Sequence, residues 1–210
     1  MIKNVIFDIG NVLLDFCWKD HIARFGFQGE KADRIAQAMM LGPIWPKLDL
    51  GLESDEDILE QFVAHTPELE QEIRLVFSDL STIVREYEGS VDWIESLKAR
   101  GYHTYYLSNY GERIRREASK ELSFLSHMDG GIMSYTVHLA KPDPAIYQTL
   151  LDRYGLKAEE SIFLDDTNIN VDAACGVGMK GLLVESQALG IAGIVVTSQE
   201  QAKKELETLL

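Results

Sequence analysis

The chain has few cysteines, no long apolar run and a shortage of basic residues. Its two cysteines, Cys17 and Cys175, form no metal-ligand or redox spacing, so we expect both to be small buried residues. No apolar run approaches the roughly 18 residues that a membrane-spanning helix needs. The first residues enter a strand pattern without the charged region, apolar core and cleavage site of a secretory signal. The cytoplasm is therefore the expected compartment.

The shortage of basic residues restricts the possible partners. Lysine and arginine number 20 against 34 aspartates and glutamates, which gives a formal net charge of −14. Nucleic acids normally require a basic surface and anionic membranes attract basic segments, so we expect no nucleic-acid and no membrane partner. An anionic small molecule fits only where local cations or a metal ion reverse the field at the site.

Apolar runs alternate with amphipathic stretches along most of the chain. Its 210 residues suffice for one sizeable core, or for a core with a smaller insert. This alternation predicts an α/β fold with a doubly wound, Rossmann-like parallel sheet. The runs cover residues 5–7, 104–107, 132–137, 162–164 and 181–184, with a weaker run at 194–196, and the helical stretches cover 91–98, 145–154 and 171–174.

The alternation is interrupted between about residues 17 and 84. This segment shows no convincing strand, only helical patterns separated by glycines and prolines. Ser54 followed by three acidic residues is typical of a helix start. We therefore predict a core domain of residues 1–15 and 86–210 with a small α-helical cap domain, residues 16–85, inserted after the first strand. Residues 198–210 read as an amphipathic closing helix.

Polar side chains follow three of the predicted strands, at the edge where a doubly wound sheet binds its ligands. The first strand is followed by Asp8, the second by Ser108 and Asn109, and the fourth by Asp165 and Asp166. Lys141 precedes a helix that begins near residue 144. Each of these residues alone is explained as a cap, a turn or a solvated charge. Their joint occurrence at one sheet edge indicates a site.

The residue types of this edge indicate a particular chemistry. Carboxylates gathered at one edge repel one another unless a cation joins them, and Mg²⁺ prefers oxygen ligands and the oxygens of a bound phosphate. A lysine supplies the positive charge that a phosphoryl group requires. A serine hydroxyl and backbone N–H groups at a strand-to-helix turn complete a site for phosphate.

These residues resemble the motifs of the haloacid dehalogenase (HAD) superfamily of aspartate-nucleophile hydrolases. The four motifs occur in the family's order, and the resemblance covers about residues 1–15 and 86–190. The helical insert lies where the family's first class of cap is inserted. The motifs are VIFDIGNV at 5–12, LSN at 107–109, KPDP at 141–144, and FLDD at 163–166 with Asn170 following.

The resemblance implies a covalent mechanism assisted by Mg²⁺. Asp8 would attack phosphorus and become an aspartyl phosphate. Asp8 and Asp166 would bind the metal directly together with the backbone carbonyl of Gly10, and Asp165 would act indirectly or through a water molecule. The implied substrate is a small phosphorylated molecule.

The resemblance also assigns the phosphate contacts. Ser108, the backbone of Asn109 and Lys141 would hold the phosphoryl oxygens, which makes Lys141 a catalytic residue beside Asp8. Phosphoryl transfer depends mostly on positioning and charge stabilisation, and these groups provide both. A carboxylate nucleophile divides the hydrolysis into two easier steps.

One position departs from the family pattern. Family phosphatases usually carry a second Asp two residues after the nucleophile as general acid and base, and here that residue is Gly10. Its carbonyl can still bind a metal, but it has no proton to deliver. We therefore expect a steep dependence of the rate on leaving-group pKa, unless a cap residue such as His21 supplies the proton. The other interpretation of His21 is a solvent-exposed side chain.

The segment FDIGNV resembles a bacterial subgroup that includes phosphatases of glucose 1-phosphate, which favours a sugar phosphate as substrate. The residues 51–56 are similar to the cap of that subgroup. Caps contribute the residues that contact the leaving group, and Trp18 and Trp45 are candidates to line the cleft, with core packing as their commoner role.

Two other functions are compatible with parts of this pattern. The 2-haloacid dehalogenases of the family also lack the second Asp and use no metal, but their fourth motif carries no paired aspartates. Asp165 and Asp166 therefore favour a phosphatase. A binding or regulatory protein that keeps the fold without turnover is the remaining alternative.

Overall fold

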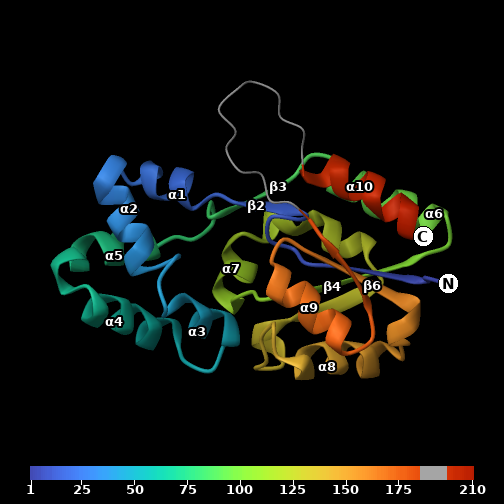
Figure 1. Cartoon of the computed structure of the whole chain (residues 1–210). Coiled ribbons are helices and arrows are strands. Elements are labelled where there is room, and N and C mark those ends of the chain that lie inside the picture. The colour runs from blue at the N-terminus through green and yellow to red at the C-terminus, as the bar shows by residue number, and fades with distance from the viewer. Residues whose placement is uncertain (185–197) are drawn as a thin grey trace.

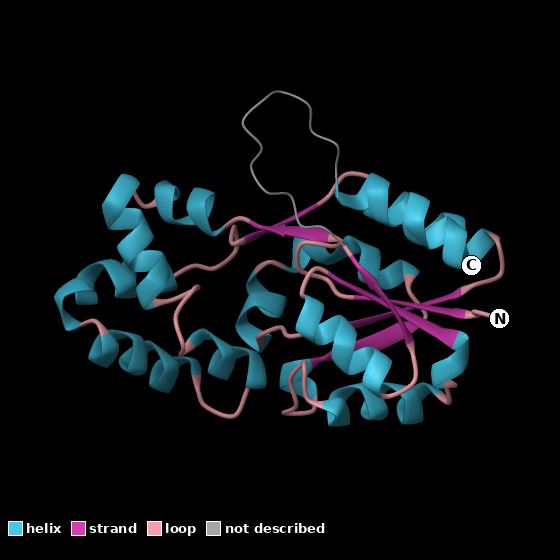
Figure 2. Cartoon of the chain, viewed as in Figure 1, coloured by secondary structure: helices cyan, strands magenta, loops and turns pink. Residues whose placement is uncertain are grey.

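The computed structural model describes residues 1–184 and 198–210. Its main element is a parallel five-stranded sheet with the strand order β5-β4-β1-β6-β7. The doubly wound parallel sheet expected from the sequence is confirmed (Figures 1 and 2). The strands are β1 (Asn4–Phe7), β4 (His103–Ser108), β5 (Gly130–Met133), β6 (Ser161–Asp165) and β7 (Lys180–Leu183).

The central strand β1 is buried on both faces. Val5, Ile6 and Phe7 are all inaccessible to solvent, as expected for a strand with helices on either side. Successive side chains point to opposite faces. Phe7 contacts Trp93 edge to face on one side, with ring centroids 4.9 Å apart. Ile6 belongs to the apolar cluster on the other side, which also contains Tyr147.

Helices cover both faces of the sheet. The helices α6 (Ser90–Ala99) and α10 (Ser198–Leu209) lie on one face, and α8 (Pro144–Tyr154) and α9 (Asn168–Gly176) on the other (Figure 1). These helices confirm the amphipathic stretches and the closing helix predicted from the sequence. Local residues explain the bounds of α8. The Asp143 side chain accepts the Ala145 N–H at its start, and Gly155 ends it with a φ of 63°.

The interrupting segment is helical, as predicted. Its helices gather beside the sheet on the left of Figure 1. Ser54 accepts the N–H of Asp57 and begins one of them, which confirms the predicted helix start. The helices of the segment are α1 (Trp18–Arg24), α2 (Gly29–Ala38), α3 (Trp45–Leu50), α4 (Asp55–His65), the 3-10 turn Pro67–Leu69 and α5 (Glu70–Phe77).

The sequence analysis did not predict two short strands at the ends of the helical segment. β2 (Leu14–Phe16) and β3 (Val84–Glu86) form an antiparallel pair in which Leu14 faces Glu86 and Phe16 faces Val84. Strands this short leave no readable alternation in a sequence. The pair places side by side the two segments by which the chain enters and leaves the helical segment. We retain as a proposal that residues 16–85 form a cap on a core of residues 1–15 and 86–210.

The remaining described helical segments belong to the sheet half of the molecule. Helix α7 follows β4, and the 3-10 turns connect strands and helices around the sheet. They are α7 (Glu112–Glu117) and the 3-10 segments Ser119–His127, Ser134–Thr136 and Ala158–Glu160.

Two sequence predictions need correction, and one cannot be compared. The strand expected at 132–137 ends at Met133, because Ser134 turns into the 3-10 segment and its hydroxyl bonds to the backbone of residue 49. Cys17 is buried as expected, but Cys175 in α9 is exposed. The weaker run at 194–196 lies outside the described residues.

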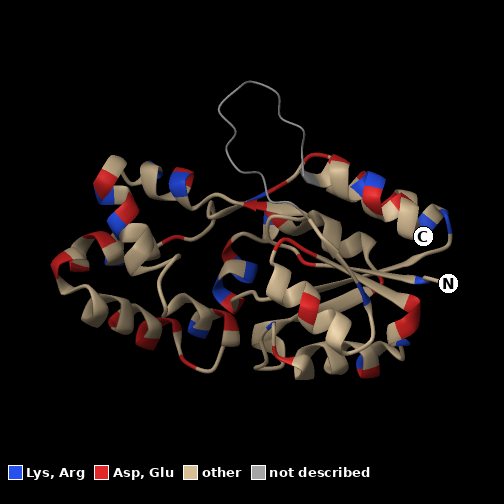
Figure 3. Cartoon of the chain, in the orientation of Figure 1, with Lys and Arg blue, Asp and Glu red and all other residues tan. Residues whose placement is uncertain are grey.

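Charged side chains are spread over the outer helices of both halves (Figure 3). None of the helices in residues 1–184 and 198–210 has both the length and the apolar content to cross a membrane.

Candidate active site

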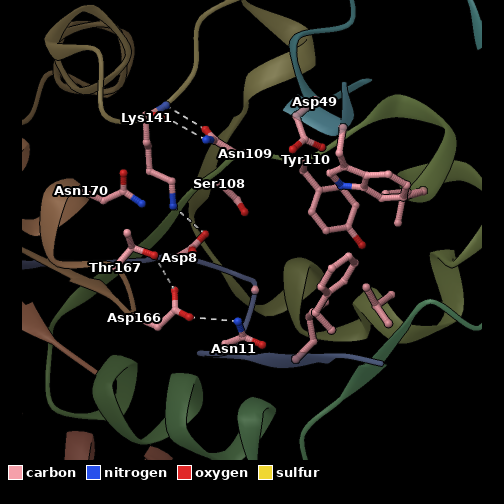
Figure 4. Close-up of a pocket in the computed structure, with 16 residues that line it drawn as sticks. Asp8, Asn11, Asp49, Ser108, Asn109, Tyr110, Lys141, Asp166, Thr167 and Asn170 are labelled. Carbon is pink, nitrogen blue, oxygen red and sulfur yellow. Dashed lines mark hydrogen bonds and ion pairs between the residues drawn. The ribbon is translucent and has the colours of Figure 1, made fainter. Parts of the chain in front are cut away.

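The predicted site residues meet in one pocket at the carboxyl edge of the sheet. β1 lies between β4 and β6, so the strand order reverses at β1 and the ends of these three strands converge. Figure 4 shows the side chains of this pocket. Of the predicted residues, all but Asp165 line the pocket, namely Asp8, Gly10, Ser108, Asn109, Lys141 and Asp166.

Lys141 joins two of the carboxylates. Its Nζ lies 2.8 Å from Oδ1 of Asp8 and 2.6 Å from Oδ2 of Asp165. Burial alone lowers the pKa of Lys141, but the negative charges of Asp8 and Asp165 outweigh burial and raise this pKa. The lysine therefore carries its positive charge into the pocket.

Asp165 is held from behind the pocket. Its carboxylate is inaccessible to solvent and accepts hydrogen bonds from the Thr167 N–H (2.8 Å) and from the Asn170 amide (3.0 and 3.1 Å). Together with Lys141, these donors engage both oxygens. Asp165 is therefore placed to orient Lys141 rather than to reach into the pocket.

Asp166 faces the pocket and is oriented by Asn11. Nδ2 of Asn11 donates to Oδ2 of Asp166 over 2.9 Å, and the Thr167 hydroxyl donates to Oδ1 over 3.3 Å. Asn11 adopts a φ of 54°, a conformation that asparagine tolerates better than most residues. The sequence interpretation missed this residue. The feature of the sequence that could have identified Asn11 is its position directly after Gly10 in the VIFDIGNV motif.

The carboxylates of this edge fit a metal ion. One oxygen from each of Asp8, Asp165 and Asp166 lies within 4.8 Å of the others. Burial raises the pKa of Asp8 to about 7, Lys141 acts against this rise, and Asp165 adds to it. Burial, followed by the charge of Asp165, also raises the pKa of Asp166. An oxygen-only donor set with more negative than positive charge suits Mg²⁺, and Asp8 and Asp166 are the two that line the pocket.

Asn109 fixes the loop that carries Lys141. Its Nδ2 donates to the carbonyl of Lys141 over 3.0 Å, and its Oδ1 accepts the Lys141 N–H over 2.8 Å. This paired contact occupies the amide side chain. Ser108, at the end of β4, is buried and its side chain reaches the pocket beside Asp8 (Figure 4).

The helical segment completes the pocket. Trp45 and Asp49 of α3 line it, whereas Trp18 packs against the main apolar cluster instead. The sequence interpretation missed Asp49, because an acidic residue on a short helix resembles a solvated charge. The other walls are apolar and come from Leu14, Phe16, Val84 and Ile114.

His21 does not belong to this site. It is fully buried, with Nδ1 3.0 Å from the Thr82 hydroxyl and Nε2 3.3 Å from the Val76 carbonyl. Burial lowers its pKa. Both sequence interpretations of His21, a solvent-exposed residue and a proton donor in the pocket, were therefore wrong. Packing between distant helices decided its position.

Comparisons with known proteins agree with this fold. A family model described as a haloacid dehalogenase-like hydrolase matches residues 2–178. Acyl-CoA dehydrogenase family member 10 of Mus musculus is 30% identical over 219 aligned residues, which cover 99% of this chain but only 19% of that protein. A sesquiterpene phosphatase of Aspergillus oryzae is 26% identical, with 86% of this chain and 88% of the phosphatase covered.

Solved structures share the fold at lower sequence identity. A HAD family enzyme of Bacteroides thetaiotaomicron, solved with magnesium and inorganic phosphate, matches with a TM-score of 0.69 and 21% identity. The match covers 90% of this chain and 96% of that enzyme. The L-2-haloacid dehalogenase of Xanthobacter autotrophicus matches with a TM-score of 0.67 and 18% identity, over 90% of this chain and 80% of the dehalogenase.

Proposed function

The chain belongs to the haloacid dehalogenase-like hydrolases, and we propose that it is a Mg²⁺-dependent phosphatase that hydrolyses a small phosphorylated metabolite through an aspartyl-phosphate intermediate. One observation carries the proposal. Lys141 bridges Asp8 and Asp165 at the pocket floor, and Asp166 adds a third carboxylate within metal-binding distance. The similarity to a sesquiterpene phosphatase supports it.

The proposed roles follow the positions of the residues. Asp8, at the end of β1, attacks phosphorus, and splitting the hydrolysis into two steps lowers each barrier. Lys141, the Ser108 hydroxyl and the backbone of Asn109 hold the phosphoryl oxygens. Asp8, Asp166 and the Gly10 carbonyl would hold Mg²⁺, which would supply positive charge that offsets the charge of the phosphate.

A 2-haloacid dehalogenase is the main alternative function, because solved dehalogenases share the fold. Displacement of a halide from carbon needs no metal. Without a metal, a second carboxylate close to the nucleophilic carboxylate would only repel its negative charge. Here Asp166 lines the pocket close to Asp8. This arrangement favours a phosphatase.

The substrate class has two candidates. The sequence favours a sugar phosphate. The pocket supports a phosphate ester of a compact apolar alcohol, because much of its wall is apolar and offers few partners for sugar hydroxyls. The apolar wall consists of Leu14, Phe16, Trp45, Val84 and Ile114.

Phosphate release tests the function and separates these candidates. We would compare glucose 1-phosphate, benzyl phosphate and a branched alkyl phosphate with added Mg²⁺, with EDTA, and with Mg²⁺ restored. A phosphatase releases phosphate only when the metal is present. Release of chloride from 2-chloropropionate without metal would identify a dehalogenase. Phosphate binding without turnover of any ester would identify a binding protein.

Affinity for Mg²⁺ is expected to increase with pH between about 6 and 8. The pKa of Asp8 is raised to about 7, so its carboxyl group is mostly protonated below this pH and the proton competes with the metal. Above this pH the carboxylate is free to bind. Isothermal titration calorimetry in two buffers of different ionisation enthalpy measures both the affinity and the protons released. Equal affinity at both ends of the range would contradict the expectation.

Asp166→Ala and Asp165→Ala are expected to fail in different ways. Loss of a direct metal ligand should raise the Mg²⁺ concentration for half-maximal activity by at least about 100-fold, beyond the effect typical of an indirect partner. Asp165→Ala leaves Lys141 without one of its two carboxylates and should mainly lower the melting temperature. A larger Mg²⁺ requirement in Asp165→Ala than in Asp166→Ala would reverse the assigned roles.

A further inference from the structure

Gly10 has no side chain that could donate a proton to the leaving group. Hydrolysis of an alkyl phosphate needs such a donor, since an alkoxide is a poor leaving group. The titratable side chains that line the pocket are Asp8, Asp49, Tyr110, Lys141 and Asp166. We propose that Asp49, contributed by α3 of the helical segment, donates the proton to the leaving oxygen and then accepts a proton from the attacking water. This inference rests on the proposed phosphatase function.

The backbone carbonyls of Asp49 and of the next residue, Leu50, are anchored to the sheet half of the molecule. The Ser134 hydroxyl donates to the Asp49 carbonyl over 2.5 Å and accepts the Tyr110 N–H over 2.9 Å. Nδ1 of His138 lies 2.9 Å from the carbonyl of Leu50. These contacts hold the end of α3 against the segment that follows β5.

Close packing restricts this end of α3 further. Gly51 has a φ of 63°, and a Cβ at this position would lie 2.8 Å from Cβ of Tyr135. A Cβ at Gly111 would lie 3.1 Å from Cγ of Leu48. Because Gly51 has no Cβ to clash with Tyr135, and Gly111 has none to crowd Leu48, α3 sits close enough to the sheet for Asp49 to line the same pocket as Asp8 (Figure 4).

The surroundings of Asp49 suit a proton carrier. Burial raises its pKa to about 7, the negative charge of Asp8 adds to the rise, and Lys141 and a hydrogen bond from the Gly111 backbone oppose it. A carboxyl group with a pKa near the working pH can both give and take a proton. Tyr110, which also faces Asp49, is buried and has a raised pKa, so it stays protonated.

The other titratable side chains of the pocket either have a proposed role or hold their protons too tightly. Lys141 is paired with two carboxylates, and its raised pKa makes it a poor donor. Asp8 is the proposed nucleophile and Asp166 a proposed metal ligand. Tyr110 holds its proton too tightly, because burial raises its pKa. Among the titratable pocket-lining groups of the described chain, Asp49 alone has neither another proposed role nor a pKa too high for proton transfer.

The proposed steps balance without a further reactant. An Asp8 oxygen bonds to phosphorus as the bond from phosphorus to the leaving oxygen breaks, and that oxygen receives the Asp49 proton. The Asp49 carboxylate then takes a proton from water as the water oxygen bonds to phosphorus. The bond from phosphorus to Asp8 breaks, phosphate departs, and Asp49 holds a proton again.

Asp49→Asn separates two substrates of similar size. Benzyl phosphate has a leaving group that needs the proton, whereas 4-nitrophenyl phosphate has one that leaves without it. We expect kcat/KM for benzyl phosphate to fall by about 10²–10³-fold and that for 4-nitrophenyl phosphate by less than about tenfold. Asp33→Asn, an exposed acid on α2, serves as the matched control and should change neither value.

The pH profile gives a second readout. In the wild type, kcat/KM for benzyl phosphate should fall as pH rises through the pKa of Asp49, because the acid form disappears. This limb should be absent in Asp49→Asn and retained in Asp49→Glu, which still carries a carboxyl group. Unchanged binding of inorganic phosphate with Mg²⁺ by Asp49→Asn shows that the site is intact.

The outcomes distinguish this inference from the function on which it rests. Equal losses on both esters, or no loss on either, would overturn the role of Asp49 while leaving the phosphatase function in place. A wild-type protein that releases phosphate from neither ester overturns both. A selective loss with benzyl phosphate, together with loss of the pH limb, supports the proton role.

Discussion

Asp8→Asn is expected to lower kcat for phosphate release by at least about 10⁴-fold, because a nucleophile that forms the covalent intermediate has no substitute in the pocket. The amide keeps the size of the side chain but removes both the attacking oxygen and a metal ligand. Stability should change little. Burial already disfavours the Asp8 charge, and Lys141 keeps its contact with Asp165.

The measurement is single-turnover phosphate release with a melting curve on the same sample. Asp92→Asn makes the same chemical change at an exposed position of α6 and should retain wild-type kcat. Retention of more than about a hundredth of the wild-type kcat by Asp8→Asn would exclude Asp8 from the covalent role. Mass spectrometry of the wild type quenched in acid, with a phosphate adduct expected on Asp8, provides an independent test.

Lys141→Met is expected to remove activity and much of the stability together. Methionine approximates the length of the lysine stem but leaves the Asp8 and Asp165 carboxylates buried without their cation. Removing one partner of a buried ion pair typically costs about 3–5 kcal/mol of unfolding free energy. Apart from this loss of stability, the loss of the positive charge that binds phosphate should lower kcat/KM by at least about 10³-fold.

The pH dependence of this variant has a definite sign. Lys141 opposes the effect of burial on Asp8, so without the lysine the pKa of Asp8 in the folded state rises further, and the folded variant keeps a proton that the unfolded chain releases. The deficit in stability should therefore grow as pH rises from about 5 to about 8. Urea unfolding of the wild type and the variant at both pH values measures this deficit. A deficit that is larger at the lower pH would contradict the proposed pairing of Lys141 with Asp8 and Asp165.

Lys31→Met is the matched control for Lys141→Met. Lys31 also pairs with a carboxylate, Glu72, but half of its side chain is exposed (51%). Exposed ion pairs contribute at most about 1 kcal/mol, because water already solvates both charges. A loss of stability in Lys31→Met as large as that in Lys141→Met would mean that burial does not decide the strength of these pairs.

The sequence by itself determined the sheet, the helices on its two faces and the polar residues at its carboxyl edge. These features follow from the pattern of apolar and polar residues within short stretches of the chain. Apolar runs bounded by polar residues become buried strands, and amphipathic periodicity places the helices. Asp8, Ser108 and Asp165 stand at the carboxyl ends of their strands, so a parallel sheet brings them to the same edge.

Only the tertiary structure decided which side chains reach the pocket from elsewhere. Asp49 and His21 both lie in the helical segment, yet α3 is anchored through Ser134 while His21 turns inward to Thr82. Local sequence cannot distinguish them, because each orientation depends on a partner more than 50 residues away. The fold also placed Asp165 behind Lys141 and Asp166 in the open pocket, since adjacent residues at a strand end point in different directions.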